Sequence, residues 1–203
     1  SVTHNSSFKV DTTSPTANFT KATDNVGTVQ GDFTSDNTTD DTTLVLSGTN
    51  EAESSVKVYD NSTELGTATA ADNGTSWSYT ATVANGTTHQ FNVRETDLAG
   101  NTSAAASNFT GAGETSAPTA NFTAATDDVG TVTGALTSGN TTDDTALVLS
   151  GTNESGSSVK VFNGSTELGA ATVSGTSWSY SATGANGTTY QFNVKETDLA
   201  GNT

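Results

Sequence analysis

The feature that most constrains this chain is an internal repeat. The stretch Gln90–Thr102 recurs almost letter for letter as Gln191–Thr203, and Ser47–Glu51 recurs as Ser150–Glu154. Repetition at this spacing indicates two copies of one folding unit, each of roughly 100 residues, which is long enough to bury a core. We therefore predict two domains in tandem.

Apolar residues in each copy alternate with polar ones, as in half-buried strands. Val56-Lys57-Val58 and Trp77-Ser78-Tyr79 follow this period of two, and turn signals such as Asn85-Gly86 separate the segments. No segment has the apolar period of a helix, and we interpret residues 25–41 as a long polar connection. The fold class is therefore all-β, with two antiparallel sheets packed as a sandwich in each copy. The expected cores are Leu44, Leu46, Val56, Val58, Trp77, Phe91 and Val93, and Leu147, Leu149, Val159, Val161, Trp178, Phe192 and Val194.

The domain boundaries follow from the two prolines of the chain. Pro15 and Pro118 each come after a short polar joint, and we place the first sandwich at residues 11–113 and the second at residues 114–203.

Residues 1–10 resemble the stretch that follows the Gly-Asn-Thr loop of the first copy. We assign to them the closing strand of a preceding repeat. The given sequence stops at Thr203, before such a strand. We therefore expect either an open sheet edge in the second sandwich or a neighbouring molecule that supplies its own residues 1–10 in a head-to-tail strand exchange.

The charge of the chain excludes several kinds of partner. Its net charge is −16, from 22 acidic and 6 basic residues, so nucleic acid and anionic membrane surfaces are not expected to bind. No apolar run approaches the ~20 residues of a membrane span, so we expect no membrane insertion. The absence of cysteine excludes disulfides and thiolate metal sites.

Carboxylates gather in loops that a sandwich places at its two ends. Asp97 and Asn101 belong to a loop where the chain enters a module, whereas Asp24, Asp40 and Asp41 belong to a segment where it leaves. Consecutive modules would bring these ends together, and Ca²⁺ prefers six to eight such oxygen ligands. The expected calcium ligands are Asp11, Asp24, Asp40, Asp41, Asp97, Asn101, Glu114, Asp127, Asp128, Asp143, Asp144, Asp198 and Asn202. The alternative is that these loops are solvated surface in which the acidic residues only form turns.

Catalysis is not expected. His89 is replaced by Tyr190 in the second copy and His4 has no clear counterpart, so neither histidine is a repeated base. We interpret His89 as a residue on the surface of a strand. No insertion that could form a pocket interrupts the repeat, so we expect no small-molecule substrate. The Trp77-Ser78-Tyr79 segment could stack on sugars if it were exposed, although core packing is the simpler interpretation.

A set of short motifs, repeated in the same order, resembles the immunoglobulin-like extender repeats of large bacterial surface adhesins of the RTX type, which are exported by type I secretion. The motifs in the first copy are residues 11–15, 23–27, 39–42, 46–49, 77–79 and 96–101. The resemblance covers essentially the whole chain. It implies monomeric β-sandwich modules strung end to end outside the bacterial cell, with calcium stiffening the joints so that a distal ligand-binding region is held away from the surface. An extracellular module that binds a glycan or a partner protein is the alternative.

Two departures from that pattern stand out. The glycine- and aspartate-rich nonapeptide repeats of RTX proteins are absent from this stretch. The second joint has Glu114 where the first has Asp11.

Overall fold

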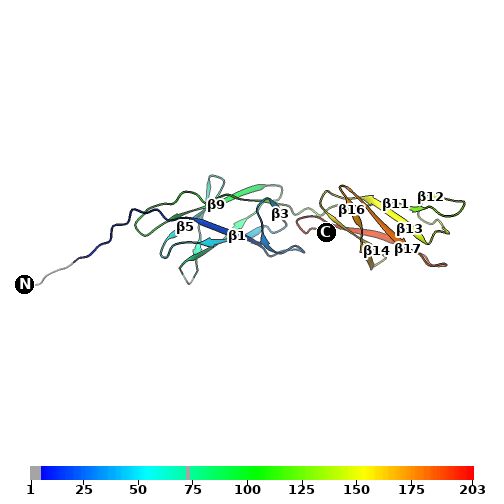
Figure 1. Cartoon of the computed structure of the whole chain (residues 1–203), viewed down its shortest axis with the longest axis horizontal. Coiled ribbons are helices and arrows are strands. Elements are labelled where there is room, and N and C mark those ends of the chain that lie inside the picture. Colours follow the sequence, from blue (N-terminus) through cyan, green and yellow to red (C-terminus); the bar gives the residue numbers. More distant parts are fainter. Residues whose placement is uncertain (1–5, 72–73) are drawn as a thin grey trace, which may run out of the picture. The chain divides into compact units, whose positions relative to one another are not determined.

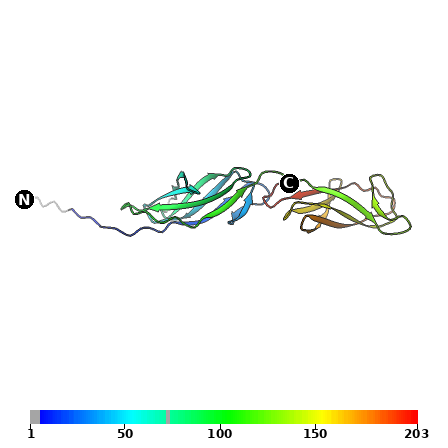
Figure 2. The same ribbon diagram turned by 90° about the horizontal axis from the view of Figure 1, so that it is seen from above.

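The computed structural model describes residues 6–71 and 74–203, and the regular structure in these ranges consists of strands. The chain divides into two units, Ser1–Thr115 (unit 1) and Ser116–Thr203 (unit 2). Within each unit the strands form two facing layers (Figures 1 and 2). The described residues include no helix that could cross a membrane.

The first sheet of unit 1 is antiparallel throughout, in the order β2-β1-β4-β8-β7. Its strands are β1 (Asn18–Asp24), β2 (Gly31–Phe33), β4 (Thr43–Thr49), β7 (Thr69–Ala70) and β8 (Ser76–Thr82). Asn18 at the start of β1 pairs with Thr49 at the end of β4. We call this end of unit 1 the entrance end, and the end where β1 finishes at Asp24 the exit end.

The second sheet of unit 1 has the order β3-β10-β9-β5-β6. Its strands are β3 (Asn37–Thr39), β5 (Ser55–Asp60), β6 (Thr63–Thr67), β9 (Thr88–Thr96) and β10 (Phe109–Gly113). β10 is antiparallel to β9 and parallel to β3, so it lies between them. The late strand β10 therefore closes the sheet.

The core of unit 1 is the one that the alternation predicts. All seven expected residues are buried, because residues two apart on a strand face the same side. Aromatic rings extend this core from both sheets: Phe109 of β10 stacks on Phe19 at 5.1 Å between ring centroids.

Unit 2 repeats the first sheet but has a smaller second sheet. The sheets have the orders β12-β11-β13-β17-β16 and β15-β14-β18. The strands are β11 (Asn121–Asp127), β12 (Gly134–Leu136), β13 (Ala146–Thr152), β14 (Ser158–Asn163), β15 (Thr166–Ala170), β16 (Thr172–Ser174), β17 (Ser177–Thr183) and β18 (Phe192–Thr197).

Five of the seven expected core residues of unit 2 are buried. Phe192 and Val194 of β18 are only partly buried, although they pack against the core. Their counterparts Phe91 and Val93 are covered in unit 1, where β10 pairs with β9. Both residues therefore contribute to the core as expected, but they keep partial exposure because no described residue pairs along the outer edge of β18.

The expectation of a connection without strands at residues 25–41 is wrong. This connection contains β2 and β3, which the three-residue sequences Gly-Asp-Phe and Asn-Thr-Thr are too short to predict. Residues 6–10 form no strand within this chain, and their assignment to the closing strand of a preceding repeat stays a prediction. Residues 1–5, including His4, lie outside the described residues.

Candidate functional site

At the exit end of unit 1, two aspartates are buried and hold the loops together. Asp24 accepts hydrogen bonds from Val26 N (3.0 Å) and Thr39 Oγ1 (2.6 Å). Asp41 accepts hydrogen bonds from Thr43 N (2.7 Å) and Asn25 N (3.2 Å). Both carboxylates therefore satisfy backbone N–H groups in the manner of Asx turns.

Asp40 and Glu114 lie beside this pair. The carboxylate of Asp40 occupies the space that a side chain at position 27 would need, and Gly27 adopts a left-handed φ of 68°. The Glu114 amide donates to Thr39 O at 2.8 Å, which brings that residue to the exit end of unit 1. Four of the predicted ligands thus belong to the exit end of unit 1.

The same arrangement recurs in unit 2. Asp127 accepts from Val129 N and Thr142 Oγ1, and Asp144 accepts from Ala146 N. Asp127 and Asp144 are buried, whereas the predicted ligands Asp128 and Asp143 are exposed. Asp24, Asp41, Asp127 and Asp144 are each withdrawn into the loops that they cap, and their role as calcium ligands stays a prediction.

At the entrance end of unit 1, Asp97 and Asn101 close one tight loop. Asp97 Oδ1 accepts from Asn101 N and Asp97 Oδ2 accepts from Asn101 Nδ2, both at 2.8 Å. The Asn101 amide also donates to Asp11 O at 3.1 Å, so three predicted ligands meet here. The side-chain hydrogen bond from Asn101, helped by backbone N–H groups of the loop, lowers the pKa of Asp97 below its ordinary value.

Unit 2 builds the same loop. Asp198 Oδ1 accepts from Asn202 N and Asp198 Oδ2 accepts from Asn202 Nδ2, both at 2.9 Å. Both Asp–Asn pairs are only partly buried, so their carboxylates can still reach solvent.

Glu95, two residues before Asp97, is a structural residue in the interior. It is fully buried, and its Oε1 accepts hydrogen bonds from Glu51 N and from Ser54 Oγ at 2.6 Å. Its Oε2 is buried without a hydrogen-bond donor among the described residues, as is Oε2 of Glu196 in unit 2. Alternation could have predicted this burial, because Glu95 shares a strand face with Phe91 and Val93.

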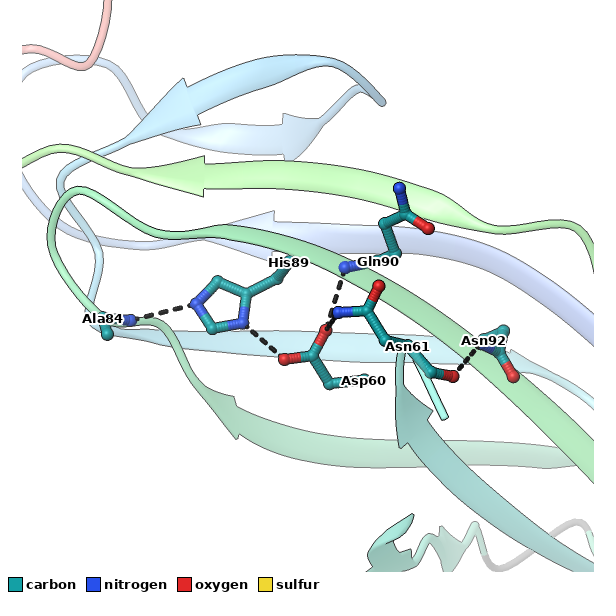
Figure 3. A network of polar contacts seen from close by, with 6 residues as sticks. All are labelled: Asp60, Asn61, Ala84, His89, Gln90 and Asn92. Carbon is teal, nitrogen blue, oxygen red and sulfur yellow. Dashed lines mark hydrogen bonds and ion pairs between the residues drawn. The ribbon is translucent and has the colours of Figure 1, made fainter. Parts of the chain in front are cut away.

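A second polar network surrounds His89, which is buried rather than on the strand surface as predicted (Figure 3). Ala84 N donates to Nε2 at 3.2 Å, so Nδ1 carries the proton and donates to Asp60 Oδ2 at 2.8 Å. Asp60 Oδ1 accepts from Gln90 N at 2.9 Å. Both ring nitrogens of His89 therefore hold the hairpin together, and neither is directed at a substrate site.

Unit 2 keeps this network with different residues. Tyr190 replaces His89, and its hydroxyl accepts from Ala185 N at 2.9 Å. Asn163 replaces Asp60 and accepts from Gln191 N at 2.8 Å. Both positions differ between the units while hydrogen bonds to the backbone are kept, which indicates that this network has a structural role.

Both tryptophans are buried and bond within their own sheets. Trp77 and Trp178 are each 2% exposed and donate to Asn18 O and Asn121 O, both at 3.1 Å. They offer no stacking platform for a sugar, so they do not support the alternative function as a glycan-binding module.

The donor set fits calcium in its chemistry and is incomplete in number. Carboxylate and amide oxygens suit a hard cation. Among residues 6–71 and 74–203, however, no group of three or more His, Cys, Asp or Glu side chains is arranged to hold a metal ion. At the entrance end, Asp97, Asn101 and Asp11 can supply part of a coordination shell, and further oxygens would have to come from outside the unit.

The profile of the bacterial Ig-like domain matches residues 12–110 and again residues 115–203. These matches cover nearly the whole chain, so the chain belongs to the bacterial Ig-like domain family, with two tandem copies. No curated protein matches it. Membership of this family indicates a structural or surface module.

Proposed function

We propose that the two domains are calcium-stiffened spacer modules of a repetitive adhesin of the RTX type on a bacterial cell surface. They would hold a distal ligand-binding region away from the cell and act through length and stiffness. The observation that carries the proposal is the gathering of oxygen donors at both ends of unit 1. Asp11, Asp97 and Asn101 meet at the entrance end, and Asp24, Asp40, Asp41 and Glu114 belong to the exit end.

In this proposal, calcium binds where consecutive modules meet. One end of a module supplies too few ligands, and the neighbouring module supplies the others. Without a cation, the carboxylates at such a joint would repel one another, in a chain that already carries a net charge of −16. Magnesium suits the joint less well because it requires stricter octahedral geometry and loses its waters reluctantly.

Calcium should raise the thermal stability of the chain. Extracellular calcium modules often bind with a Kd of ~10⁻⁴ to 10⁻³ M, so millimolar calcium would add about 1 kcal/mol for each site through mass action on the folded state. The measurement is thermal unfolding in millimolar calcium and in excess chelator, with magnesium as the control. A calcium-selective rise of the midpoint is expected, whereas identical midpoints would reduce the acidic loops to solvated turns.

Asp97→Ala and Asp198→Ala are the matched variants for this test. Asp198→Ala should remove part of the calcium-dependent rise, because Asp198 belongs to the entrance end of unit 2 and hence to the proposed joint. Asp97→Ala lies outside that joint and should leave the rise unchanged. Asp32→Ala is the control, because Asp32 is exposed on β2 and pairs only with Lys21 among the described residues. Small-angle scattering with and without calcium then tests stiffness, since a spacer should become more extended when calcium is bound.

A further inference from the structure

Each unit contains one buried glutamate that is bonded through only one of its two carboxylate oxygens. In unit 1, Glu95 is 0% exposed, and its Oε1 accepts hydrogen bonds from Glu51 N and Ser54 Oγ. Its Oε2 is buried and meets no donor among the described residues. Carboxylates are rarely buried in this way unless a positive charge or a metal ion compensates them. Glu95 therefore requires a partner at Oε2.

The amide of Asn50 adds a second unpaired oxygen to the same cluster. Asn50 Nδ2 donates to Glu51 O at 2.7 Å and to Ser54 Oγ at 3.2 Å, which fixes the orientation of the amide. Asn50 Oδ1 is buried, and within the described part of the chain no donor reaches it. Because Ser54 Oγ bonds to both the Asn50 amide and the Glu95 carboxylate, the two unpaired oxygens belong to one cluster.

This cluster has more acceptors than protons. Ser54 Oγ lies 2.8 Å from Glu51 O and 2.6 Å from Glu95 Oε1, but a hydroxyl donates only one proton. A water molecule would bring protons and would leave the buried carboxylate without a counter-charge. Neither Glu95 nor Glu196 forms an ion pair with a described residue. A small cation satisfies the unpaired oxygens and supplies the counter-charge as well.

Unit 2 repeats the cluster atom for atom. Glu196 is 2% exposed, and its Oε1 accepts from Glu154 N and Ser157 Oγ, both at 2.6 Å. Asn153 Nδ2 donates to Ser157 Oγ at 3.2 Å. Oε2 of Glu196 and Oδ1 of Asn153 are again buried without a described donor. The two residues between the glutamate and the serine of this loop differ between the units, so the cluster is kept where its surroundings vary.

We propose that the cluster of each unit binds one alkali cation, Na⁺ or K⁺. The ligands are Glu95 Oε2 and Asn50 Oδ1 in unit 1, and Glu196 Oε2 and Asn153 Oδ1 in unit 2. One carboxylate balances one monovalent charge, whereas Ca²⁺ takes six to eight oxygen ligands, more than this cluster offers.

The surroundings of the cluster in unit 1 leave room for the rest of the coordination shell. A hollow of about 100 Å³ lies beside Asn50 and Ser54, which is enough space for water molecules that complete the shell. The site lies inside a single unit, so it does not depend on the calcium joint of the proposed function.

The test is thermal unfolding of the full chain in sodium, potassium and choline chloride at equal ionic strength, with excess chelator to remove divalent ions. Choline is too large to enter the cluster. We expect a higher midpoint in sodium or potassium than in choline, and the difference should grow with the alkali concentration because the ion binds the folded state. Equal midpoints in the three salts would overturn the proposal, whatever the result of the calcium experiment.

The double variant Glu95→Gln, Glu196→Gln locates the ion. Each glutamine keeps an oxygen for the hydrogen bonds of the loop, and its N–H groups can donate to the neighbouring asparagine. The variant should therefore fold and lose the difference between alkali and choline salts. Glu64→Gln with Glu167→Gln is the control, because it removes two exposed carboxylates and should keep the difference. A difference that persists without the two buried carboxylates would show that the ion binds elsewhere.

Discussion

At the residue scale, the Asp97–Asn101 pair shows how a short motif lowers the pKa of one carboxylate. The hydrogen bonds from Asn101 favour the ionised form, which lowers the pKa of Asp97 in the folded protein. This contribution to stability is therefore present above the ordinary pKa of an aspartate and is lost as the pH falls through the lowered value.

Asn101→Ala should raise the pKa of Asp97 towards its ordinary value, because the largest cause of the shift is removed. The measurement is an NMR titration of the Asp97 carboxyl carbon in both proteins. Asn108→Ala, which changes an exposed asparagine elsewhere, should leave the titration as it is. An unchanged titration midpoint in Asn101→Ala would mean that the backbone N–H groups of the loop alone lower the pKa of Asp97.

Glu95 gives a second prediction at this scale. Glu95→Ala should destabilise unit 1 by about 1–3 kcal/mol for each donor left without a partner, since Glu51 N and Ser54 Oγ both donate to it. Urea unfolding of the full chain measures the loss, and Glu196→Ala should behave alike in unit 2. Glu53→Ala is the control, because it removes an exposed carboxylate from the loop that contains Glu51 and Ser54. An equal loss of stability in Glu53→Ala would contradict a role for the buried hydrogen bonds of Glu95.

At the scale of elements, the corresponding networks of the two units predict that substitutions at positions 60 and 89 have coupled effects on the free energy of unfolding. Asp60→Asn and His89→Tyr together recreate the Asn163 and Tyr190 pair of unit 2, whereas each change alone breaks the hydrogen bond between the two side chains. The double variant should be more stable than the sum of the single effects by about 0.5–3 kcal/mol. A double-mutant cycle in urea measures this difference, and strict additivity would show that the two positions act independently.

The strands also show which parts of the fold could be predicted from the sequence. Long strands with alternating apolar residues, such as β4 and β9, were predictable because burial on one face leaves a period of two. β2 and β3 have only three residues each, too few to show an alternating pattern, and they are strands because β1 and β10 pair with them. Pairing with a distant partner leaves no local signal.

In the candidate site, too, the sequence predicted the local contacts and missed the ones between distant residues. The motifs brought Asp97 and Asn101 together correctly, because both belong to one loop. The burial of Asp24 and Asp41 depends on contacts with Thr39 and Asn25, which the sequence does not state. Long-range contacts therefore decide whether an aspartate in a turn caps backbone groups or faces solvent.

At the scale of the whole molecule, the two units share a fold, and among the described residues unit 2 has no counterpart of the strands β3 and β10. In unit 1, β10 forms backbone hydrogen bonds with β9 and adds the Phe109 ring to the core. Each Å² of apolar area that is buried in this way contributes about 25 cal/mol to the free energy of unfolding. Unit 2 should therefore unfold at a lower denaturant concentration than unit 1. Appending the sequence of residues 103–114 after Thr203 should supply the strand to unit 2 and raise its midpoint towards that of unit 1.

Each unit contains one tryptophan, which makes the two transitions separable. Trp77→Phe leaves Trp178 to report on unit 2, and Trp178→Phe leaves Trp77 to report on unit 1. The appended segment should shift the Trp178 signal and leave the Trp77 signal in place, and the same segment with its phenylalanine changed to aspartate is the control. An unshifted Trp178 transition would mean that unit 2 reaches its full stability from β11–β18 alone, so that an open edge costs this module nothing.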